Sequence, residues 1–218
     1  MDCRISFKNA STLDKLCSVF KSSYLVIDTR QNVNFQLVSD SKNIVSNLTL
    51  NISFFEECQL KNMILKINKP RFSYAKMISL RIETTQSFLI FEYEFEDYVY
   101  RHRYVIFEGS LYQVPFVINR SDYIDSFLLY QVISQTSGQA KIKFDDSCSE
   151  VYNENINLKF ICTGFSGITF NFESDTFKNI LSNNDLFDSC LLNWEDNESP
   201  INMNFYGTTI SAFYFLAT

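Results

Sequence analysis

The sequence predicts an α+β protein made of two similar domains in tandem. Three observations support this prediction: short alternating segments typical of β-strands recur along the chain, four segments have the apolar spacing of short helices, and each helix follows a strand. The strands that precede the helices begin near Cys3, Asn62, Leu111 and Ile168, at intervals of 59, 49 and 57 residues. A strand–helix unit that recurs four times indicates a domain of two units that is then repeated.

The first strand–helix unit opens the chain. Residues Cys3–Phe7 alternate between apolar and polar side chains, and Ser11–Phe20 follow with the spacing of an amphipathic helix. Ser11 and Asp14 occupy capping-box positions, which indicates a helix start at Ser11. The apolar face of this helix would consist of Leu13, Leu16, Cys17 and Phe20.

The second unit pairs a strand at Asn62–Ile67 with a helix predicted over Lys69–Ile78. Pro70 suits the first turn of a helix, where the N–H group that proline lacks would have no intrahelical partner. One face of this helix would consist of Phe72, Ala75 and Ile78. The first half of the chain is thus predicted to contain two complete units.

The second half repeats the arrangement. A strand at Leu111–Ile118 precedes a helix predicted over Arg120–Ile133. A strand at Ile168–Phe172 precedes a short helix that Ser174 would cap and that ends at Leu181. Further alternating segments lie between the helices and complete the predicted sheets.

The boundary between the two predicted domains falls near Glu108–Gln113, where a turn signal follows a long strand. The domains would span residues 1–108 and 109–218, and each is long enough to bury a core. The 22 Phe and 12 Tyr favour strands and aromatic packing. No membrane span or secretory signal is expected, because no long uncharged apolar segment is present and no apolar region follows the first residues.

Charge and cysteine content narrow the function classes. A net charge of −6 argues against a protein that reads the sequence of DNA, although not against one that gathers its bases on one surface. The six cysteines lie far apart without a Cys-x-x-Cys pair, and His102 is the only histidine, so no metal site is predicted. We expect six free thiols in a reducing compartment.

No catalytic motif is present in the sequence. It contains no P-loop, dinucleotide-binding turn, Gly-x-Ser-x-Gly elbow or His-Glu-x-x-His, so neither enzyme activity nor a cofactor is expected. Glu92, Glu94 and Glu96 share one face of a predicted strand and could hold Mg²⁺ for a nuclease, but a solvated outer sheet face explains them better. His102 lacks a catalytic partner, which favours a surface or interface position.

The repeated architecture resembles that of the eukaryotic DNA sliding clamps, whose subunits have two domains built from repeated strand–helix–strand units. Val33–Leu50 is similar to the clamp region that leads to the partner-peptide pocket, and Phe213–Thr218, "FYFLAT", is similar to the clamp C-terminus. The resemblance implies two tandem sliding-clamp domains, with helices lining the hole of a ring and sheets outside.

Within that family, the second half resembles the "nine" subunit of the heterotrimeric nine-one-one DNA-damage checkpoint clamp. Ile168–Thr218 follow the order of that subunit: a strand and a short helix, a strand ending at Trp194, an acidic turn from Glu195 to Pro200, and two closing strands. Ser53–Cys58, "SFFEEC", also fits that subunit.

A sliding ring needs basic residues that contact phosphates without reading bases. The resemblance implies that the DNA-facing residues are Lys15, Lys69, Arg71, Lys76 and Lys178. Three of these lysines fall on polar faces of predicted helices, where lysines also occur for solubility alone. The third predicted helix carries Asp122 and Asp125 instead, so we expect weak DNA contact from the second domain.

Clamp rings close when edge strands pair between subunits. The candidate strands are Tyr98–Phe107 and Asn155–Cys162, and the alternative explanation of the first is an ordinary solvated strand. The interface residues on them would be Tyr100, His102, Tyr104, Leu158 and Phe160.

The resemblance also implies a pocket for partner peptides, which would be an apolar hole beside a strand edge. Its residues would be Val38, Leu111, Val114, Phe215 and Ala217. For Phe215, a position in the core of the last strand is an equally good explanation.

The function expected from this resemblance is that of one subunit of a DNA-encircling ring of the DNA-damage checkpoint type. Its partners would be double-stranded DNA without sequence preference, two other clamp subunits, an ATP-dependent clamp loader, and checkpoint and repair proteins in the nucleus. A homotrimeric replicative processivity clamp is the first alternative, and the Mg²⁺-dependent nuclease is the second.

Overall fold

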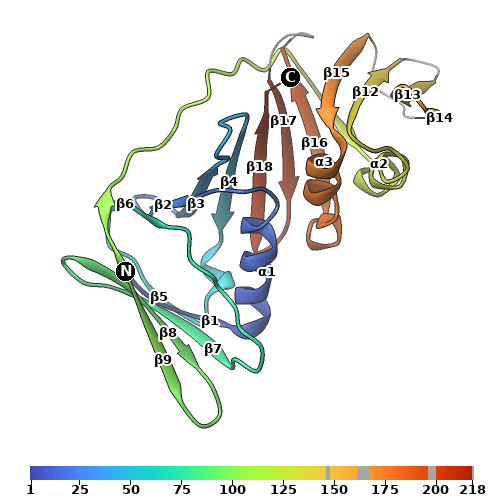
Figure 1. Ribbon diagram of the computed structural model, residues 1–218. Helices are drawn as coiled ribbons and strands as arrows, with labels where there is room; N and C mark the ends of the chain where they lie inside the picture. Colours follow the sequence, from blue (N-terminus) through green and yellow to red (C-terminus); the bar gives the residue numbers. More distant parts are fainter. Residues whose placement is uncertain (146–147, 162–166, 196–199, 218) are drawn as a thin grey trace. The chain divides into compact units, whose positions relative to one another are not determined.

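The computed structural model describes residues 1–145, 148–161, 167–195 and 200–217 (Figure 1). The chain divides into two compact units, which are Met1–Gln113 with Thr208–Ser211, and Val114–Gly207 with Ala212–Thr218. The mixture of helices and strands confirms the predicted α+β class. The domain boundary expected after Glu108 stays a prediction.

The first unit begins with a strand, a helix and a run of further strands. Its elements are β1 (Asp2–Ser6), α1 (Phe7–Cys17), β2 (Tyr24–Asp28), β3 (Val33–Val38), β4 (Ile44–Leu50), a 3₁₀ turn (Ile52–Phe54), β5 (Glu57–Gln59), β6 (Ile64–Asn68), β7 (Ser79–Thr84), β8 (Phe88–Glu94), β9 (Val99–Val105) and β10 (Phe107–Glu108). One sheet has the order β5-β1-β7-β8-β9, and β10-β6-β2-β3-β4 are neighbours in a second sheet. Neighbouring strands are antiparallel.

The second unit has the same kinds of elements. They are β11 (Arg120–Ile124), α2 (Ser126–Ile133), β12 (Gln139–Phe144), β13 (Ser149–Tyr152), β14 (Asn157–Phe160), β15 (Ile168–Glu173), α3 (Ser174–Leu181), a 3₁₀ turn (Asn184–Leu186), β16 (Ser189–Trp194), β17 (Ile201–Tyr206) and β18 (Ile210–Leu216). One sheet has the order β14-β13-β12-β15, and β18, β17, β16 and β11 are hydrogen-bonded neighbours in that order. Helices α2 and α3 pack against each other (Figure 1).

Helix α1 starts four residues before its predicted start. The side chain of Ser6 caps the helix by accepting a hydrogen bond from the Asn9 N–H at 3.3 Å, so Ser11 lies inside the helix. The capping box predicted for Ser11 and Asp14 is therefore wrong. The Asp14 carboxylate instead accepts hydrogen bonds from the Phe72 N–H at 2.7 Å and the Ser73 hydroxyl at 2.9 Å.

The helix predicted over Lys69–Ile78 is wrong, because this segment is irregular. Its aromatic residue Phe72 is fully buried between Phe35 of β3 and Phe91 of β8, with ring centroids 5.7 Å from each. Lys76 has a φ of 65°, which belongs to the left-handed region and interrupts an α-helix. Packing of one ring between two sheets therefore outweighs the helical pattern.

The third strand–helix unit is shifted along the chain. Leu111–Ile118 form no strand, and Arg120–Ile124, predicted as helix, form β11, which pairs with β16. The Asp125 carboxylate caps α2 by accepting hydrogen bonds from two backbone N–H groups at 3.0 Å. The acidic helix face predicted from Asp122 and Asp125 is therefore wrong: one residue lies in a strand, and the other is a cap.

The fourth unit is confirmed as a strand followed by a helix, with a different cap. Glu173 caps α3 by accepting hydrogen bonds from the N–H groups of Asp175 and Thr176, at 3.3 and 2.6 Å. Ser174 is instead buried, with its hydroxyl 2.9 Å from that of Thr136.

The prediction of six free thiols is wrong, because two of the cysteines form a disulfide. Cys3 of β1 and Cys58 of β5 lie opposite each other and are joined by a disulfide, because antiparallel pairing brings distant residues face to face. Cys17 and Cys190 are buried thiols, and burial raises the pKa of each to about 12. Cys148 is also free, whereas Cys162 lies outside the described residues.

No helix in the described ranges is both long enough and apolar enough to span a membrane.

Candidate functional site

A groove of about 840 Å³ lies on the first unit, over β2 and β3. Alternation along β3 buries Phe35 and Leu37 and turns Gln36 and Val38 to the opposite face, where they line the groove. Residues 108–113 are called the connector below, and all of them except Gly109 also line the groove. Of the predicted pocket residues, Val38 and Leu111 are both present in this lining.

The side chains at the β2 end of the groove are held by specific contacts. The Lys66 ammonium lies 4.1 Å from the centroid of the Tyr24 ring, and Phe107 meets that ring edge-on at 6.3 Å. The Asp40 carboxylate accepts hydrogen bonds from the N–H and hydroxyl groups of Ser23, at 3.0 and 2.8 Å. The groove thus combines apolar surface with positioned charges of both signs.

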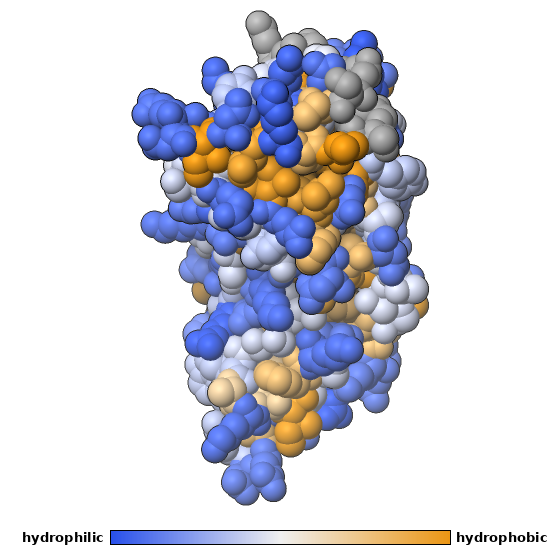
Figure 2. Space-filling model, turned by 90° about the vertical axis from the view of Figure 1, so that its right-hand side faces the viewer, coloured by the Kyte–Doolittle hydropathy of each residue, from blue (hydrophilic) through white to orange (hydrophobic). Residues whose placement is uncertain are grey.

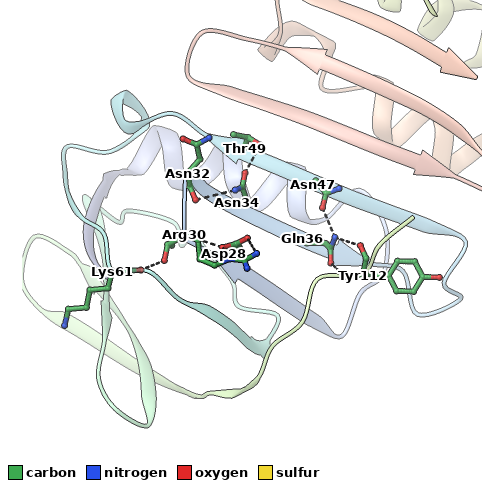
Figure 3. Close-up of polar contacts among 10 residues, drawn as sticks. Asp28, Arg30, Asn32, Asn34, Gln36, Asn47, Thr49, Lys61 and Tyr112 are labelled. Carbon is green, nitrogen blue, oxygen red and sulfur yellow. Dashed lines mark hydrogen bonds and ion pairs between the residues drawn. The ribbon is translucent and has the colours of Figure 1, made fainter. Parts of the chain in front are cut away.

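A row of polar side chains covers the outward face of the same sheet (Figure 3). Asn34 of β3 accepts a hydrogen bond from the Thr49 hydroxyl of β4 at 2.8 Å. Gln36, the next outward residue of β3, donates to the Asn47 side chain at 2.9 Å and also bonds the backbone of Tyr112 in the connector. Sequence reasoning missed Gln36 and Tyr112; the only available signal was a glutamine at an outward position of an apolar strand.

The remaining predicted pocket residues belong to the second unit. Val114 and Phe215 are half-buried, and Phe215 packs edge-on against Phe116 at 5.7 Å. Ala217 is exposed. The role of these three residues in a pocket stays a prediction.

The two strands predicted to form subunit interfaces are both edge strands. In the described part of the chain, β9 lies at one end of its sheet and β14 at one end of its own. Each therefore presents backbone N–H and C=O groups on its outer side that are available for another strand. The interface role of these strands stays a prediction.

An aromatic row lies on one face of β9. Tyr100 stacks on Tyr93 at 5.7 Å, Tyr104 meets Phe91 at 5.1 Å, and His102 lies between Tyr100 and Tyr104. Burial raises the pKa of Tyr104, so the phenol remains neutral. This row places all three predicted interface residues of β9 on the face that continues the core.

The corresponding face of β14 is also apolar. Phe160 is buried and packs against Phe144 at 6.2 Å, while Leu158 is half-buried. Ile161, which follows the strand, is 75% exposed. The apolar face of β14 is therefore partly buried, and exposed apolar surface follows directly after the strand.

The predicted DNA-facing residues of the first unit are accessible to solvent to different degrees. Lys15 of α1, Arg71 and Lys76 are exposed, and Lys69 is half-buried. Arg71 lies 4.0 Å from Asp14 of α1, which brings its guanidinium close to the helix that carries Lys15. Its guanidinium also lies 4.7 Å from the centroid of the Tyr74 ring.

Lys178 of α3 is held within the second unit. Its ammonium donates a hydrogen bond to the Thr136 carbonyl at 2.6 Å and lies 3.7 Å from the Asp175 carboxylate. These contacts leave this lysine with less freedom to reach a phosphate than Lys15 has.

Helix α2 has no charged residue. Phe127 is 60% exposed, and Leu128 and Val132 are half-buried. Figure 2 shows an apolar area on the face of the molecule that carries α2.

Two of the three glutamates proposed for a nuclease are held by arginines, and the third, Glu96, lies beyond the end of β8. Glu92 is paired with Arg101 at 2.5 Å, and Glu94 with Arg4. No group of three or more His, Cys, Asp or Glu side chains that could hold a metal ion occurs in the described residues. The arrangement is that of a charged outer sheet face.

Comparison with known structures identifies the fold. The chain is similar to a subunit in the PCNA2–PCNA3 complex from Sulfolobus tokodaii, with a TM-score of 0.75, 9% identity and coverage of 100% of this chain and 98% of that one. It is also similar to A. fulgidus PCNA bound to the C-terminal region of FEN-1, with a TM-score of 0.77, 12% identity and coverage of 99% and 97%. For the proliferating cellular nuclear antigen from Entamoeba histolytica, the TM-score is 0.68, with 12% identity and coverage of 99% and 97%.

These similarities span nearly the whole chain and establish that it has the sliding-clamp fold. No protein-family model and no curated protein matches the sequence.

Proposed function

We propose that this chain is one subunit of a ring-shaped DNA sliding clamp of the DNA-damage checkpoint type. The observation that carries the proposal is the sliding-clamp fold with an edge strand in each unit, β9 and β14. Edge strands pair readily with strands of other chains, and closed assemblies use this pairing to hide them. The ring would act by encircling DNA, without catalysis, and would recruit checkpoint and repair proteins in the nucleus.

The charges on the two edges favour partners other than copies of this chain. On the outer face of β9, Arg103 lies opposite Ile90 and has no ion pair in the described residues. On the outer face of β14, the charged residue is Lys159, which pairs with Glu150 of the neighbouring strand β13 at 3.2 Å. If β9 of one copy paired with β14 of another, with their apolar faces aligned, Arg103 and Lys159 would lie on the same side, and their repulsion, reduced by Glu150, would weaken the pair. A partner strand with acidic residues would fit β9 better.

The contact with DNA would be electrostatic and loose. Lys15, Lys69, Arg71 and Lys76 are basic residues of the first unit, and Lys178 adds one from the second. Because encirclement prevents dissociation, a few phosphate contacts are enough, and they allow sliding. Opening the ring requires a separate ATP-dependent loader.

The groove beside the connector would bind an extended peptide segment of a repair or checkpoint protein. Tyr24, Val26, Val38 and Leu111 supply apolar surface, while Asp40 and Lys66 provide charges at its rim. The similar A. fulgidus clamp is bound to the C-terminal region of FEN-1, which supports a peptide as the ligand class.

The native mass of the purified chain tests the ring proposal. Light scattering at micromolar concentration and moderate salt should give a monomer of 25.5 kDa, and a ring should form only when other clamp subunits are co-expressed. A particle of three times that mass would favour the homotrimeric replicative clamp instead. A monomer that joins no clamp subunit would contradict both assignments.

A further inference from the structure

The connector is anchored at its start to β6. Strand β10 pairs with β6, with Phe107 opposite Lys66 and Glu108 opposite Leu65. Gly109 follows so closely that an added Cβ would lie 2.9 Å from the backbone carbonyl carbon of Leu65. Only glycine fits at this distance without displacement of the backbone, so the first anchor depends on Gly109.

A second anchor holds the connector to β3 through one side chain. The Tyr112 N–H donates to Gln36 Oε1 at 2.7 Å, and Gln36 Nε2 donates to the Tyr112 carbonyl at 3.0 Å (Figure 3). The second hydrogen of Nε2 is directed to the Asn47 side chain at 2.9 Å. The amide of Gln36 therefore bonds both backbone groups of Tyr112, as a neighbouring strand would.

These two bonds join this end of the connector to a buried side chain of the first unit. Gln36 is 4% exposed, so water does not compete for its amide, whereas the Tyr112 side chain is 49% exposed. Figure 3 shows the Tyr112 ring directed away from Gln36. The backbone of Tyr112, and not burial of its ring, is therefore what is fixed.

The two anchors lie at different places across the sheet. Strand β10 is the neighbour of β6 on its outer side, so its path lies three strand spacings, roughly 14 Å, from β3. The three Cα–Cα steps from Gly109 to Tyr112 span at most about 10–11 Å when fully extended, so the side chain of Gln36 supplies the rest of the distance. Leu111, which lies between the two anchors, lines the groove.

We propose that Gln36 is a positioning residue that holds the Tyr112 end of the connector over the sheet and thereby sets one wall of the peptide groove. The inference rests on the proposed peptide-binding function of this groove. Loss of the two bonds to Tyr112 frees one end of the connector while the Gly109 anchor remains. The groove then widens, and a bound peptide must order the connector as well as itself.

The test compares Gln36→Met with Asn34→Met in the full chain. Both replace an outward amide of β3 and break one cross-strand hydrogen bond to β4, but only Gln36 touches the connector. Amide hydrogen exchange at Tyr112 should accelerate about tenfold or more in Gln36→Met and stay unchanged in Asn34→Met. Unchanged exchange at Tyr112 in Gln36→Met, or equal acceleration in both variants, would overturn the inference.

Peptide binding then separates the two proposals. The probe is a synthetic peptide with the sequence of the C-terminal region of FEN-1, added to the wild-type chain and both variants. We expect an affinity about tenfold lower for Gln36→Met than for Asn34→Met, at matched melting temperatures. If Gln36→Met shows faster exchange at Tyr112 but an unchanged peptide affinity, the positioning role of Gln36 is wrong, while the groove remains the proposed peptide site. A wild-type chain that does not bind the peptide would count against the groove, while the exchange comparison would still decide whether Gln36 holds the connector.

Gly109→Ala perturbs the same wall from its other end. The added Cβ should displace the connector from Leu65 and accelerate exchange across the β10–β6 pair, with the Gln36 bonds retained. A loss of peptide affinity similar to that of Gln36→Met is expected. Wild-type affinity in Gly109→Ala would contradict the inference that the position of the connector determines peptide binding.

Discussion

The two units share one plan but differ sharply in charge. The first unit has 14 basic and 12 acidic side chains, a net of +2, whereas the second has 5 basic and 13 acidic, a net of −8. Their first helices differ in the same direction, because α1 carries Lys8, Lys15 and Asp14, a net of +1, while α2 carries no charge. A common fold therefore does not impose a common surface, and DNA contact should come mainly from the first unit.

The largest effect should come from removing one buried ring in each unit. Phe72→Ala and Phe177→Ala each empty a fully buried site, so each should cost about 3–5 kcal/mol of unfolding free energy. Hydrogen exchange should rise in β3 and β8 for the first variant and in β15 for the second. The exposed Phe107 provides a control, since its replacement by alanine should cost much less. Equal acceleration across both units in either variant would mean that they unfold together.

Reversing one edge charge should promote self-association. Arg103→Glu would place a carboxylate on the same side of the pair as Lys159 of another copy. The association constant should rise roughly threefold to tenfold, because a repulsion is exchanged for an attraction of up to ~1 kcal/mol each, and Glu150 reduces both. Light scattering over a concentration series measures this change. Lys21→Glu makes the same charge change at an exposed position off the edge strands and should leave the mass unchanged. A variant that remains monomeric would show that charge is not what prevents self-pairing.

Neutralising single basic residues should show which unit contacts DNA, through the salt dependence of DNA binding. Lys15→Gln or Arg71→Gln should each reduce the slope of log K against log salt for duplex DNA by about 0.9, the value for one phosphate contact. Lys178→Gln should leave the slope unchanged, because the Lys178 side chain is only 24% exposed and its ammonium is bonded to the Thr136 carbonyl, whereas the Arg71 side chain is 63% exposed. Equal reductions from all three would contradict the asymmetry between the units.

The smallest effect concerns acid stability in the first unit. Hydrogen bonds from Arg30 hold the pKa of Asp28 below its ordinary value, and Arg81 does the same for Asp2. A carboxyl with a depressed folded-state pKa contributes stability above its unfolded value, near 3.9, and loses it as the pH falls further. The melting temperature of the wild type should therefore fall more between pH 5 and pH 2 than that of Asp28→Asn. Parallel curves for the two proteins would count against this contribution.

Strand positions could be predicted because alternation is a local property. The segments at Tyr24–Asp28, Val33–Val38 and Ile201–Tyr206 each form a strand with those bounds, and most of their side chains are buried. Helix prediction failed at Lys69–Ile78 because Phe72 packs between two sheets that are distant in sequence. The helix predicted at Arg120–Ile124 is wrong for a related reason, because the pairing of this segment with β16 outweighs its local helical spacing.

The candidate site could be predicted only in part. Val38 and Leu111 followed from the resemblance to clamps, and both line the groove. The Gln36 contact with Tyr112 joins residues 76 positions apart through one amide, and no periodic pattern encodes such a contact. The same holds for Asp14, a predicted capping residue that instead holds the segment at Phe72.

The sequence by itself determined the α+β class, the run of strands and the excess of acid in the second half, since these depend on residue type and local period. Only the tertiary structure decided which strands are edges, where the connector is anchored and which cysteines pair. These features depend on contacts between distant residues, whose free energies exceed the local preferences of the segments that they join.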